Sequence, residues 1–302
     1  MSRFACRVQG LASAIAGVAL SACALLAPSE ARAGDKWCRD DLVTLQQDVC
    51  YAPGPELAAG ERRTLVIFLH GLTDEGSGWQ LAMQEGMARA GKALHFSMLA
   101  PRGRNGLGPG RKPDVVAWPT SEDGRKLAED DIWQRIGRAR AEAEAKEGAP
   151  FEDVFVVGFS NGAYYASALA LRGRLADVDG YAVIAGGSAA TPPSAKGDAR
   201  KPVFIGVAAK DTTAKKGREL ARVLAKTGWP HRVSEKKVGH VVSDDHLTQA
   251  LQYLRAKARS ESPVAAVAEP SDPRNKPSAA KGQPNTTKSR QRPKASASPK
   301  AR

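Results

Sequence analysis

Residues 158–162 carry the pattern that most directly implies chemistry. They are Gly158-Phe159-Ser160-Asn161-Gly162, and they lie between an apolar run and a stretch of small residues. In a sharp turn from a strand into a helix, a Gly-x-Ser-x-Gly pattern exposes the serine hydroxyl, and side chains at the two glycine positions would collide. The amides that open the helix point toward developing negative charge. The pattern therefore predicts Ser160 as the nucleophile of an acyl-transfer reaction.

His240 is the predicted base for this nucleophile. A serine hydroxyl is weakly nucleophilic unless a histidine oriented by a carboxylate removes its proton. In this architecture the acid and then the histidine follow the serine along the chain. His240 lies in a loop between the strand-like residues 232–238 and the last predicted helix, from which it can reach a sheet edge. The alternatives, His231 at a strand start and His246 in a helix turn, have ordinary structural explanations.

Asp211 is predicted to orient that histidine. It follows the apolar run 203–208, and a carboxylate at the end of a strand can meet a histidine from the next loop. A solvated turn is the alternative role, because Lys210 and two threonines flank Asp211. Asp244 and Asp245 are further candidates, but they more naturally begin the last helix.

Two backbone amides are needed to bind the oxyanion of a tetrahedral intermediate. One belongs to the residue after the nucleophile, which is Asn161. The other is expected in a loop after an early strand, and His70-Gly71-Leu72 follows the apolar run 65–69 there. The predicted donors are therefore the amides of Leu72 and Asn161, with His70 as a structural hydrogen-bonding residue.

From Thr64 the chain alternates apolar runs with amphipathic stretches, which predicts βαβ units and a mostly parallel sheet flanked by helices. The glycine-rich residues 101–124 are predicted to form a loop, and they lack the Gly-Lys-Ser/Thr ending of a phosphate loop. The fold class is therefore α/β, with one domain over residues 64–260. Strands are predicted at 65–69, 93–99, 154–157, 181–185, 203–208 and 232–238, and helices at 79–90, 126–145, 163–171, 214–225 and 247–256.

Residues 68–79, Phe-Leu-His-Gly-Leu-Thr-Asp-Glu-Gly-Ser-Gly-Trp, resemble the oxyanion-loop motif of the acyl-protein thioesterase and phospholipase/carboxylesterase family of α/β-hydrolases. The sharp turn at residues 158–162, called the elbow below, also fits this resemblance. The position of Asp211 and the Gly239-His240 pair extend it over about residues 64–256. Ala117-Trp118-Pro119 resembles a tryptophan segment that lines the acyl site of that family. The resemblance implies an α/β-hydrolase fold and hydrolysis of carboxylic esters or thioesters by the predicted residues, without a metal or an organic cofactor.

Two positions depart from the thioesterase branch of that family. The branch usually has Gln after the nucleophile, whereas Asn161 resembles the secreted polyhydroxybutyrate-depolymerase and feruloyl-esterase branch. Thr212-Thr213 follows the predicted acid where the family often has Val-Pro. The departures leave the predicted Ser, Asp and His in place, while the physiological substrate, the acyl chain length and the preference for ester or thioester stay open.

Residues 1–33 predict a secretory signal peptide. A positively charged start precedes an uncharged, mostly apolar run, and Ala31-Arg32-Ala33 offers a cleavage site before Gly34. The run is shorter than the ~20 residues of a membrane-spanning helix. Lipoprotein processing at Leu20-Ser21-Ala22-Cys23 is the alternative, and it would attach a lipid to Cys23. Both routes predict export, to the periplasm or outside the cell.

Cys38 and Cys50 remain after either cleavage, because Cys6 is removed and Cys23 is removed or lipidated. An even pair of cysteines in an oxidising compartment predicts a disulfide, here within an N-terminal extension, residues 34–63. A zinc site is not expected, because two cysteines without nearby histidines cannot complete tetrahedral coordination.

The net charge of +13 is concentrated toward the ends of the chain. Residues 1–33 contribute +2, residues 34–260 contribute +5 and residues 261–302 contribute +6. The composition, 42% hydrophobic and 25% charged, fits a soluble globular protein and excludes collagen, a coiled coil and a polytopic membrane protein. Residues 261–302 contain seven Pro and no aromatic residue, Leu, Ile or Met, so this basic tail is predicted to be disordered.

Two hypotheses of different classes follow. The first is an exported serine esterase that acts on a small-molecule or lipid-like acyl ester. The second is a non-catalytic cell-envelope binding protein on a hydrolase fold, held to anionic polymers or lipids by the tail, residues 261–302. Nucleic acid is not an expected partner, because the chain carries a predicted signal peptide and its tail has no aromatic residue to stack on bases. The sequence leaves the oligomeric state open.

Overall fold

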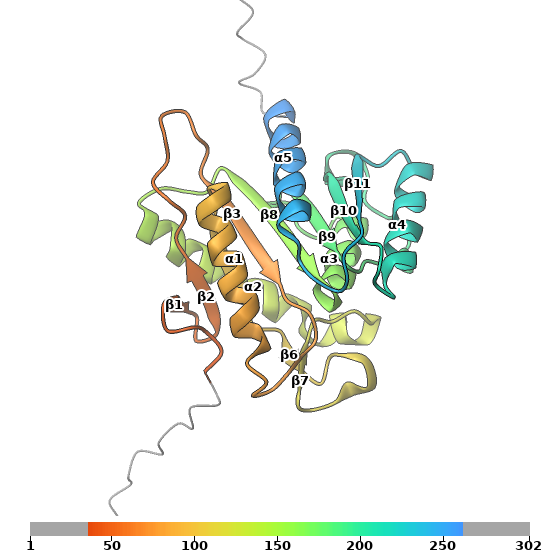
Figure 1. The fold of residues 1–302 in the computed structure, drawn as a ribbon, viewed down its shortest axis with the longest axis horizontal. Helices are drawn as coiled ribbons and strands as arrows, with labels where there is room; N and C mark the ends of the chain where they lie inside the picture. Colours follow the sequence, from red (N-terminus) through yellow and green to blue (C-terminus); the bar gives the residue numbers. More distant parts are fainter. Residues whose placement is uncertain (1–35, 262–302) are drawn as a thin grey trace, which may run out of the picture. The chain divides into compact units, whose positions relative to one another are not determined.

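A computed structural model describes residues 36–261 and shows a sheet with helices on both faces (Figure 1). The main sheet has eight strands in the order β1-β2-β5-β3-β8-β9-β10-β11. Strand β2 is antiparallel to both of its neighbours, and the other pairs that neighbour each other in the sheet are parallel. The strands are β1 (Val43–Leu45), β2 (Val49–Ala52), β3 (Thr64–Leu69), β5 (Ser97–Pro101), β8 (Asp153–Phe159), β9 (Gly180–Ile184), β10 (Val203–Ala208) and β11 (His231–Lys236).

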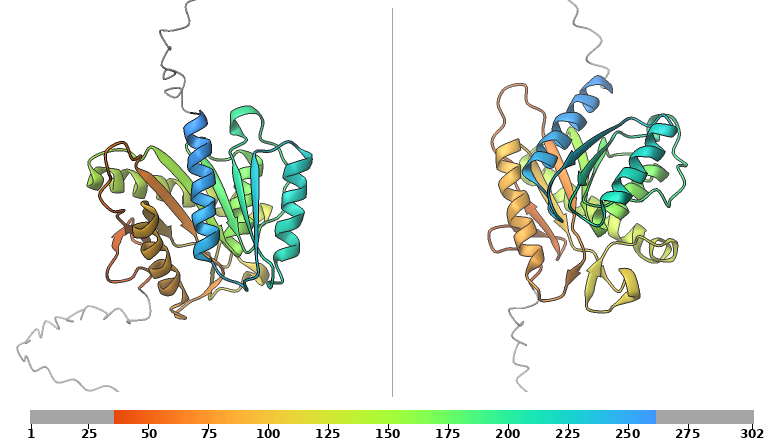
Figure 2. Two further views of the ribbon diagram at one scale, coloured as in Figure 1. Left: turned by 45° about the horizontal axis from the view of Figure 1, so that its top comes forward. Right: turned by 45° about the vertical axis from the view of Figure 1, so that its right-hand side comes forward.

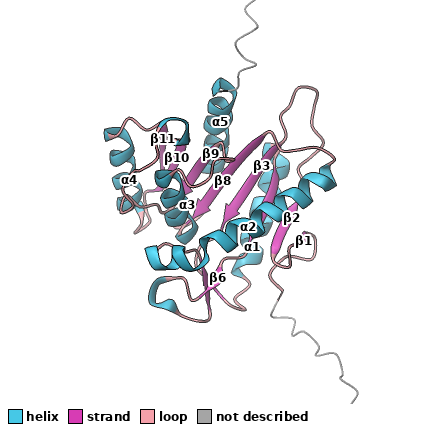
Figure 3. Cartoon of the chain, turned by 180° about the vertical axis from the view of Figure 1, so that it is seen from behind, coloured by secondary structure: helices cyan, strands magenta, loops and turns pink. Residues whose placement is uncertain are grey.

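The helices divide between the two faces of this sheet. Helices α1 (Trp79–Leu94) and α5 (Asp244–Glu261) lie in front of it in Figure 1. Helices α2 (Glu122–Glu147), α3 (Asn161–Arg172) and α4 (Ala214–Lys226) lie on the other side, which faces the viewer in Figure 3. Every residue of β3 and β8 is buried because helices cover both faces of these central strands. The predicted α/β class with a mostly parallel sheet is confirmed.

A second, three-stranded antiparallel sheet lies beyond the carboxyl end of β3 (Figures 1 and 2). It contains β4 (Thr73–Asp74), β7 (Val115–Ala117) and β6 (Arg104–Asn105). Residues 101–124, which the sequence predicts as a loop, thus hold two short strands, a 3₁₀ turn (Pro109–Arg111) and the start of α2. Strands of two or three residues are too short to produce a recognisable hydrophobic period, so the loop prediction was wrong in this respect.

One predicted strand is displaced along the sequence. Residues 93–99 were expected to form a strand, but α1 continues to Leu94 and β5 begins only at Ser97. His95 between them has a positive φ of 55°, which ends the helix and redirects the chain. The apolar run therefore belongs partly to the last turn of α1 and partly to the strand, a division that periodicity could not resolve.

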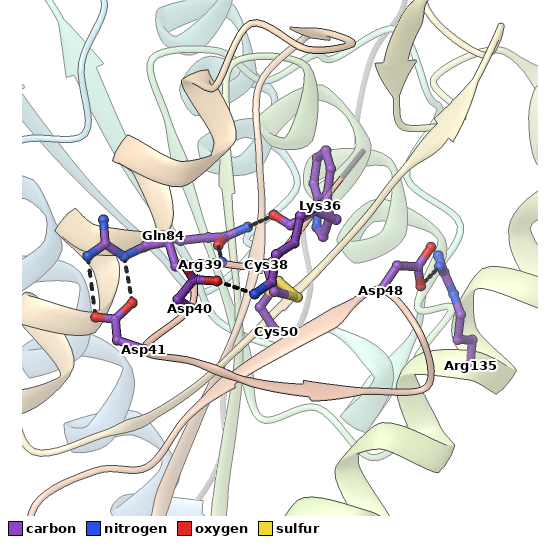
Figure 4. The surroundings of a disulfide bond; sticks show 10 residues. Lys36, Cys38, Arg39, Asp40, Asp41, Asp48, Cys50, Gln84 and Arg135 are labelled. Carbon is purple, nitrogen blue, oxygen red and sulfur yellow. Dashed lines mark hydrogen bonds and ion pairs between the residues drawn. A yellow bond between two sulfur atoms is a disulfide. The ribbon is translucent and has the colours of Figure 1, made fainter. Parts of the chain in front are cut away.

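The predicted disulfide between Cys38 and Cys50 is present (Figure 4). Residues 36–52 carry the β1–β2 hairpin, which extends the edge of the main sheet through the pairing of β2 with β5. Gln84 of α1 accepts the Arg39 amide hydrogen and donates to the Trp37 carbonyl, so side chains as well as the disulfide hold this segment. The N-terminal extension is thus an integral edge of the main sheet.

Three predictions fall outside the described residues: the signal peptide (1–33), the lipidation alternative at Cys23, and the basic tail beyond Glu261. Within residues 36–261, the helices are too short or too polar to cross a membrane. The same residues contain no group of three or more His, Cys, Asp or Glu side chains arranged to hold a metal ion.

Candidate active site

Ser160 lies in a strained turn between β8 and α3. Its backbone has φ 53° and ψ −116°, a conformation that side-chain-bearing residues rarely adopt. A Cβ atom on Gly158 would lie 2.3 Å from the Gly162 carbonyl oxygen, and one on Gly162 would lie 2.0 Å from the Leu69 carbonyl oxygen. The turn therefore requires glycine on both sides of the serine, for the steric reason that the sequence pattern predicts.

The side chains of Ser160, His240 and Asp211 form one hydrogen-bonded line. The Nε2 atom of His240 lies 2.9 Å from Ser160 Oγ, and its Nδ1 atom lies 2.5 Å from Asp211 Oδ2. An ionised carboxylate only accepts hydrogen bonds, so Nδ1 carries the proton and the lone pair of Nε2 faces the serine hydroxyl. Ser160, Asp211 and His240 follow the carboxyl ends of β8, β10 and β11, respectively, so the parallel sheet brings the three together.

Asp211 is nearly buried, with 4% of its side chain exposed. Burial by itself raises the pKa of this carboxyl group, but hydrogen bonds from His240 and Thr213 outweigh it and hold the pKa below its ordinary value. The Thr213 hydroxyl donates to Oδ2 at 2.8 Å and its amide donates to Oδ1 at 3.1 Å. Sequence reasoning missed this role of Thr213. The signal was available, because an aspartate that accepts from the amide two residues later is a common turn.

The alternative histidines and acids occupy the structural positions expected of them. His231 begins β11, and His246 is completely buried in the first turn of α5. Asp244 and Asp245 open α5, and Asp245 forms an ion pair with Lys236 at 3.1 Å. None of these four residues hydrogen-bonds to Ser160 or His240 in the part of the chain that the structure describes.

The amides of Leu72 and Asn161 are both unengaged: within residues 36–261, neither donates a hydrogen bond. The His70 carbonyl oxygen accepts from the Gly162 amide at 3.1 Å and from Trp118 Nε1 at 2.9 Å, which fixes the loop of Leu72 to the elbow. The Asn161 side chain accepts from the Trp118 amide at 2.7 Å. Asn161 thus braces the site through its side chain and leaves its own amide available.

His70 is a buried neutral histidine that links two loops. Its Nε2 atom accepts the Gly103 amide hydrogen at 3.1 Å, so the proton resides on Nδ1, which donates to the Gly71 carbonyl at 2.5 Å. Burial lowers the pKa of His70 to about 4, which keeps the ring uncharged at neutral pH. A Cβ atom on Gly103 would lie 2.4 Å from the Ala117 carbonyl oxygen, so only glycine can approach so closely. These contacts give His70 the structural role predicted for it.

Aromatic rings pack on both sides of His70. The ring centroids of Trp37 and Trp118 each lie 5.0 Å from that of His70, and Tyr165 stacks on Trp118. Trp118 is completely buried and donates to the His70 carbonyl, so it holds the loop of Leu72 and does not line an open acyl site as the resemblance implies. Trp37 comes from the N-terminal hairpin, and no sequence pattern connected it with His70.

The model of the phospholipase/carboxylesterase family matches residues 56–205 of this chain. The matched part includes the loop of His70 and Leu72 and the elbow of Ser160, and it has the fold described above. The protein is a phospholipase/carboxylesterase-like α/β-hydrolase. This family supports ester or thioester hydrolysis as the type of reaction. The match ends before Asp211 and His240, so the geometry alone connects these two residues of the hydrolase with Ser160.

Solved structures similar to the hydrolase include several esterases. The carboxylesterase of Bacillus cereus is 17% identical, with 69% of this chain and 93% of that chain covered and a TM-score of 0.47. The acyl-protein thioesterase 2 of Zea mays is 17% identical, with 70% and 98% covered and a TM-score of 0.46. The esterase PE8 is 22% identical, with 68% and 96% covered and a TM-score of 0.46. Comparison with curated proteins finds no match.

Proposed function

We propose that the protein is an exported serine ester hydrolase with Ser160 as nucleophile, His240 as general base and acid, and Asp211 as orienting carboxylate. The observation that carries the proposal is the hydrogen-bonded line of these three side chains at the strained elbow. Such a line activates a hydroxyl that is otherwise a weak nucleophile. The unengaged amides of Leu72 and Asn161 are the proposed oxyanion donors.

Acylation begins when Ser160 Oγ attacks the ester carbonyl carbon and its proton passes to His240 Nε2. The carbonyl oxygen becomes an oxyanion and accepts hydrogen bonds from the two amides. Asp211, whose pKa is held low, remains ionised and stabilises the imidazolium. The bond between the acyl carbon and the ester oxygen then breaks, and the leaving alcohol takes the proton from Nε2.

Deacylation repeats these steps with water in place of the serine. His240 takes a proton from water as its oxygen attacks the acyl carbon. The bond to Ser160 Oγ breaks, the serine recovers the proton, and a carboxylic acid leaves. A thioester would react in the same way with a thiol as leaving group. The Ser160, His240 and Asp211 side chains therefore do not select between an ester and a thioester.

Export of the enzyme is supported by the buried disulfide between Cys38 and Cys50, because disulfides persist in oxidising compartments. The predicted signal peptide, residues 1–33, lies outside the described residues. Intact-mass measurement of the mature protein tests this part: a chain that begins at Gly34 with both cysteines oxidised agrees with it. A mass that corresponds to the full chain with free thiols contradicts it.

The catalytic proposal is tested with a Ser160→Ala variant, p-nitrophenyl acetate and p-nitrophenyl butyrate as substrates, and a fluorophosphonate probe. We expect the wild-type protein to hydrolyse the esters and to carry the probe on Ser160, and we expect the variant to do neither. Ser121→Asn is the matched control, because asparagine can keep the N-cap hydrogen bond that Ser121 makes in α2. Unchanged hydrolysis by the Ser160 variant would refute the assignment. A folded wild-type protein without hydrolysis or labelling would instead favour the non-catalytic binding hypothesis.

A further inference from the structure

A cavity of about 190 Å³ lies between α1 and the loop that carries His240. Met83 and Met87 of α1 line it together with Val242 and Leu247, which follow His240 along the chain. The Phe159 ring, which packs on the His240 ring at a centroid distance of 4.8 Å, forms part of the lining. The cavity is therefore directly continuous with the proposed base.

The lining of this cavity is almost entirely apolar. Its charged members, Arg89 and Asp244, are 70% and 81% exposed and form an ion pair with each other at 3.7 Å. Trp79 and Val241, which also line it, are 50% and 46% exposed, so large apolar side chains reach solvent here. Apolar walls of this kind favour a neutral apolar group, because the two charged side chains at the cavity are exposed and pair with each other.

Gly86 keeps the α1 side of the cavity open. A Cβ atom on Gly86 would meet no atom within 4 Å, whereas one on Gly91 of the same helix would lie 2.8 Å from the Phe96 carbonyl oxygen. Gly91 thus has a packing reason to be glycine, and Gly86 has none. Glycine weakens the interior of a helix, so Gly86 lowers the stability of α1. Its structural effect is the open space that the missing side chain leaves at the cavity.

The position of the cavity relative to the reacting atoms indicates which part of a substrate it can hold. His240 lines the cavity, while Ser160, Leu72 and Asn161 are absent from its lining in the described chain. In the proposed reaction the leaving oxygen takes its proton from His240, and the oxyanion lies against the amides of Leu72 and Asn161. The leaving group therefore departs on the side of His240, where the cavity lies.

We propose that this cavity binds the leaving-group part of the substrate, and that the enzyme prefers esters of neutral, bulky apolar alcohols such as aryl alcohols. The proposal rests on the proposed serine hydrolase function and adds a substrate class to it. Discrimination in an apolar pocket is modest per group, and one methylene changes kcat/KM by about 10-fold to 200-fold. A fused aromatic ring system is therefore a suitable probe.

The test compares methyl acetate, phenyl acetate and 2-naphthyl acetate, which share the acetyl group and so share the deacylation step. In Gly86→Phe the new ring enters the cavity, and we expect kcat/KM for 2-naphthyl acetate to fall at least tenfold relative to that for methyl acetate. Gly86→Ala adds only a methyl group and should leave the ratio near the wild-type value. Gly137→Phe is the matched control, because Gly137 is an exposed glycine in the interior of α2 whose Cβ position is also free.

Met83→Trp fills the same space from another position and replaces Gly86→Phe if that variant does not fold. The proposal is overturned if the folded cavity-filling variant lowers kcat/KM equally for all three acetates or leaves it unchanged. It is also overturned if the variant changes the relative kcat/KM values for methyl acetate, methyl butyrate and methyl octanoate. The cavity would then hold the acyl chain. Absence of fluorophosphonate labelling at Ser160 in the wild-type protein would refute the proposed function itself. The ester series cannot give this result, so the two failures are distinguishable.

Discussion

The indole of Trp37 packs on the imidazole of His70, with 5.0 Å between the ring centroids. Trp37 is adjacent to Cys38, and His70 is two residues before Leu72, whose amide is a proposed oxyanion donor. The Arg102 guanidinium covers the Trp37 ring at 5.5 Å and pairs with Glu75 at 2.6 Å. The N-terminal hairpin thus supports the loop that must hold one amide in place.

Replacement of Trp37 by leucine should lower kcat for phenyl acetate about tenfold with little change in KM. A displaced Leu72 amide would lose a hydrogen bond that strengthens in the transition state, and such a loss affects kcat more than KM. Steady-state kinetics with the folded variant measure this. Trp37→Phe keeps a ring on His70 and should restore most of the rate. Equal kcat values for the leucine variant and the wild type would show that the contact is not needed for catalysis.

Removal of the Cys38–Cys50 disulfide in a double serine variant should lower the free energy of unfolding by about 2–3 kcal/mol. The disulfide closes a short loop, with a sequence separation of 12, and constrains mainly the unfolded chain. Urea unfolding of both proteins without reductant measures the difference. Reductant should bring the wild type to the stability of the variant and leave the variant unchanged. Equal stabilities without reductant would contradict the prediction.

Thr213→Val should lower kcat about tenfold, because the hydroxyl that donates to Asp211 at 2.8 Å is lost while the threonine shape is kept. Asp211→Asn should lower kcat on the order of 10⁴-fold, because an amide no longer keeps the His240 proton on Nδ1 or stabilises the imidazolium. Thr212→Val is the matched control: its hydroxyl donates to Oδ1 at 3.3 Å, a weaker contact. Hydrolysis rates at saturating p-nitrophenyl acetate measure all three. A larger effect at Thr212 than at Thr213 would argue against this geometry.

Lowering the pH should lower the free energy of unfolding through protonation of His70. Its pKa falls from the ordinary 6.5 to about 4 on folding, so the unfolded chain binds this proton more readily. The stability contributed by the neutral ring is complete above about pH 6.5 and is lost progressively as the pH falls toward 4, by about 3 kcal/mol in total. Urea unfolding of the wild type and His70→Gln at pH 7 and pH 4 measures this. The stability advantage of the wild type should shrink by that amount, and a constant difference would contradict the prediction.

Local features of the sequence were sufficient to predict most of the fold and to single out the three side chains that the structure joins by hydrogen bonds. The alternation of apolar runs with amphipathic stretches predicted the parallel strands, because strands covered on both faces must be apolar throughout. The elbow pattern predicted Ser160, because steric exclusion at Gly158 and Gly162 acts over five consecutive residues. Chain order and loop position then selected Asp211 and His240.

Only the tertiary structure could decide what depends on contacts between distant segments. The packing of Trp37 on His70, the bond from Gly103 to His70 and the cavity beside His240 each join parts of the chain that share no local pattern. The second sheet has strands too short to produce a period. Trp118, which the resemblance placed beside the substrate, is completely buried and bonded to the His70 carbonyl. The sequence by itself indicates which groups can react, because turn geometry depends on residues that are neighbours along the chain. How those groups are held, and what space lies beside them, follows from packing, which is set by the whole fold.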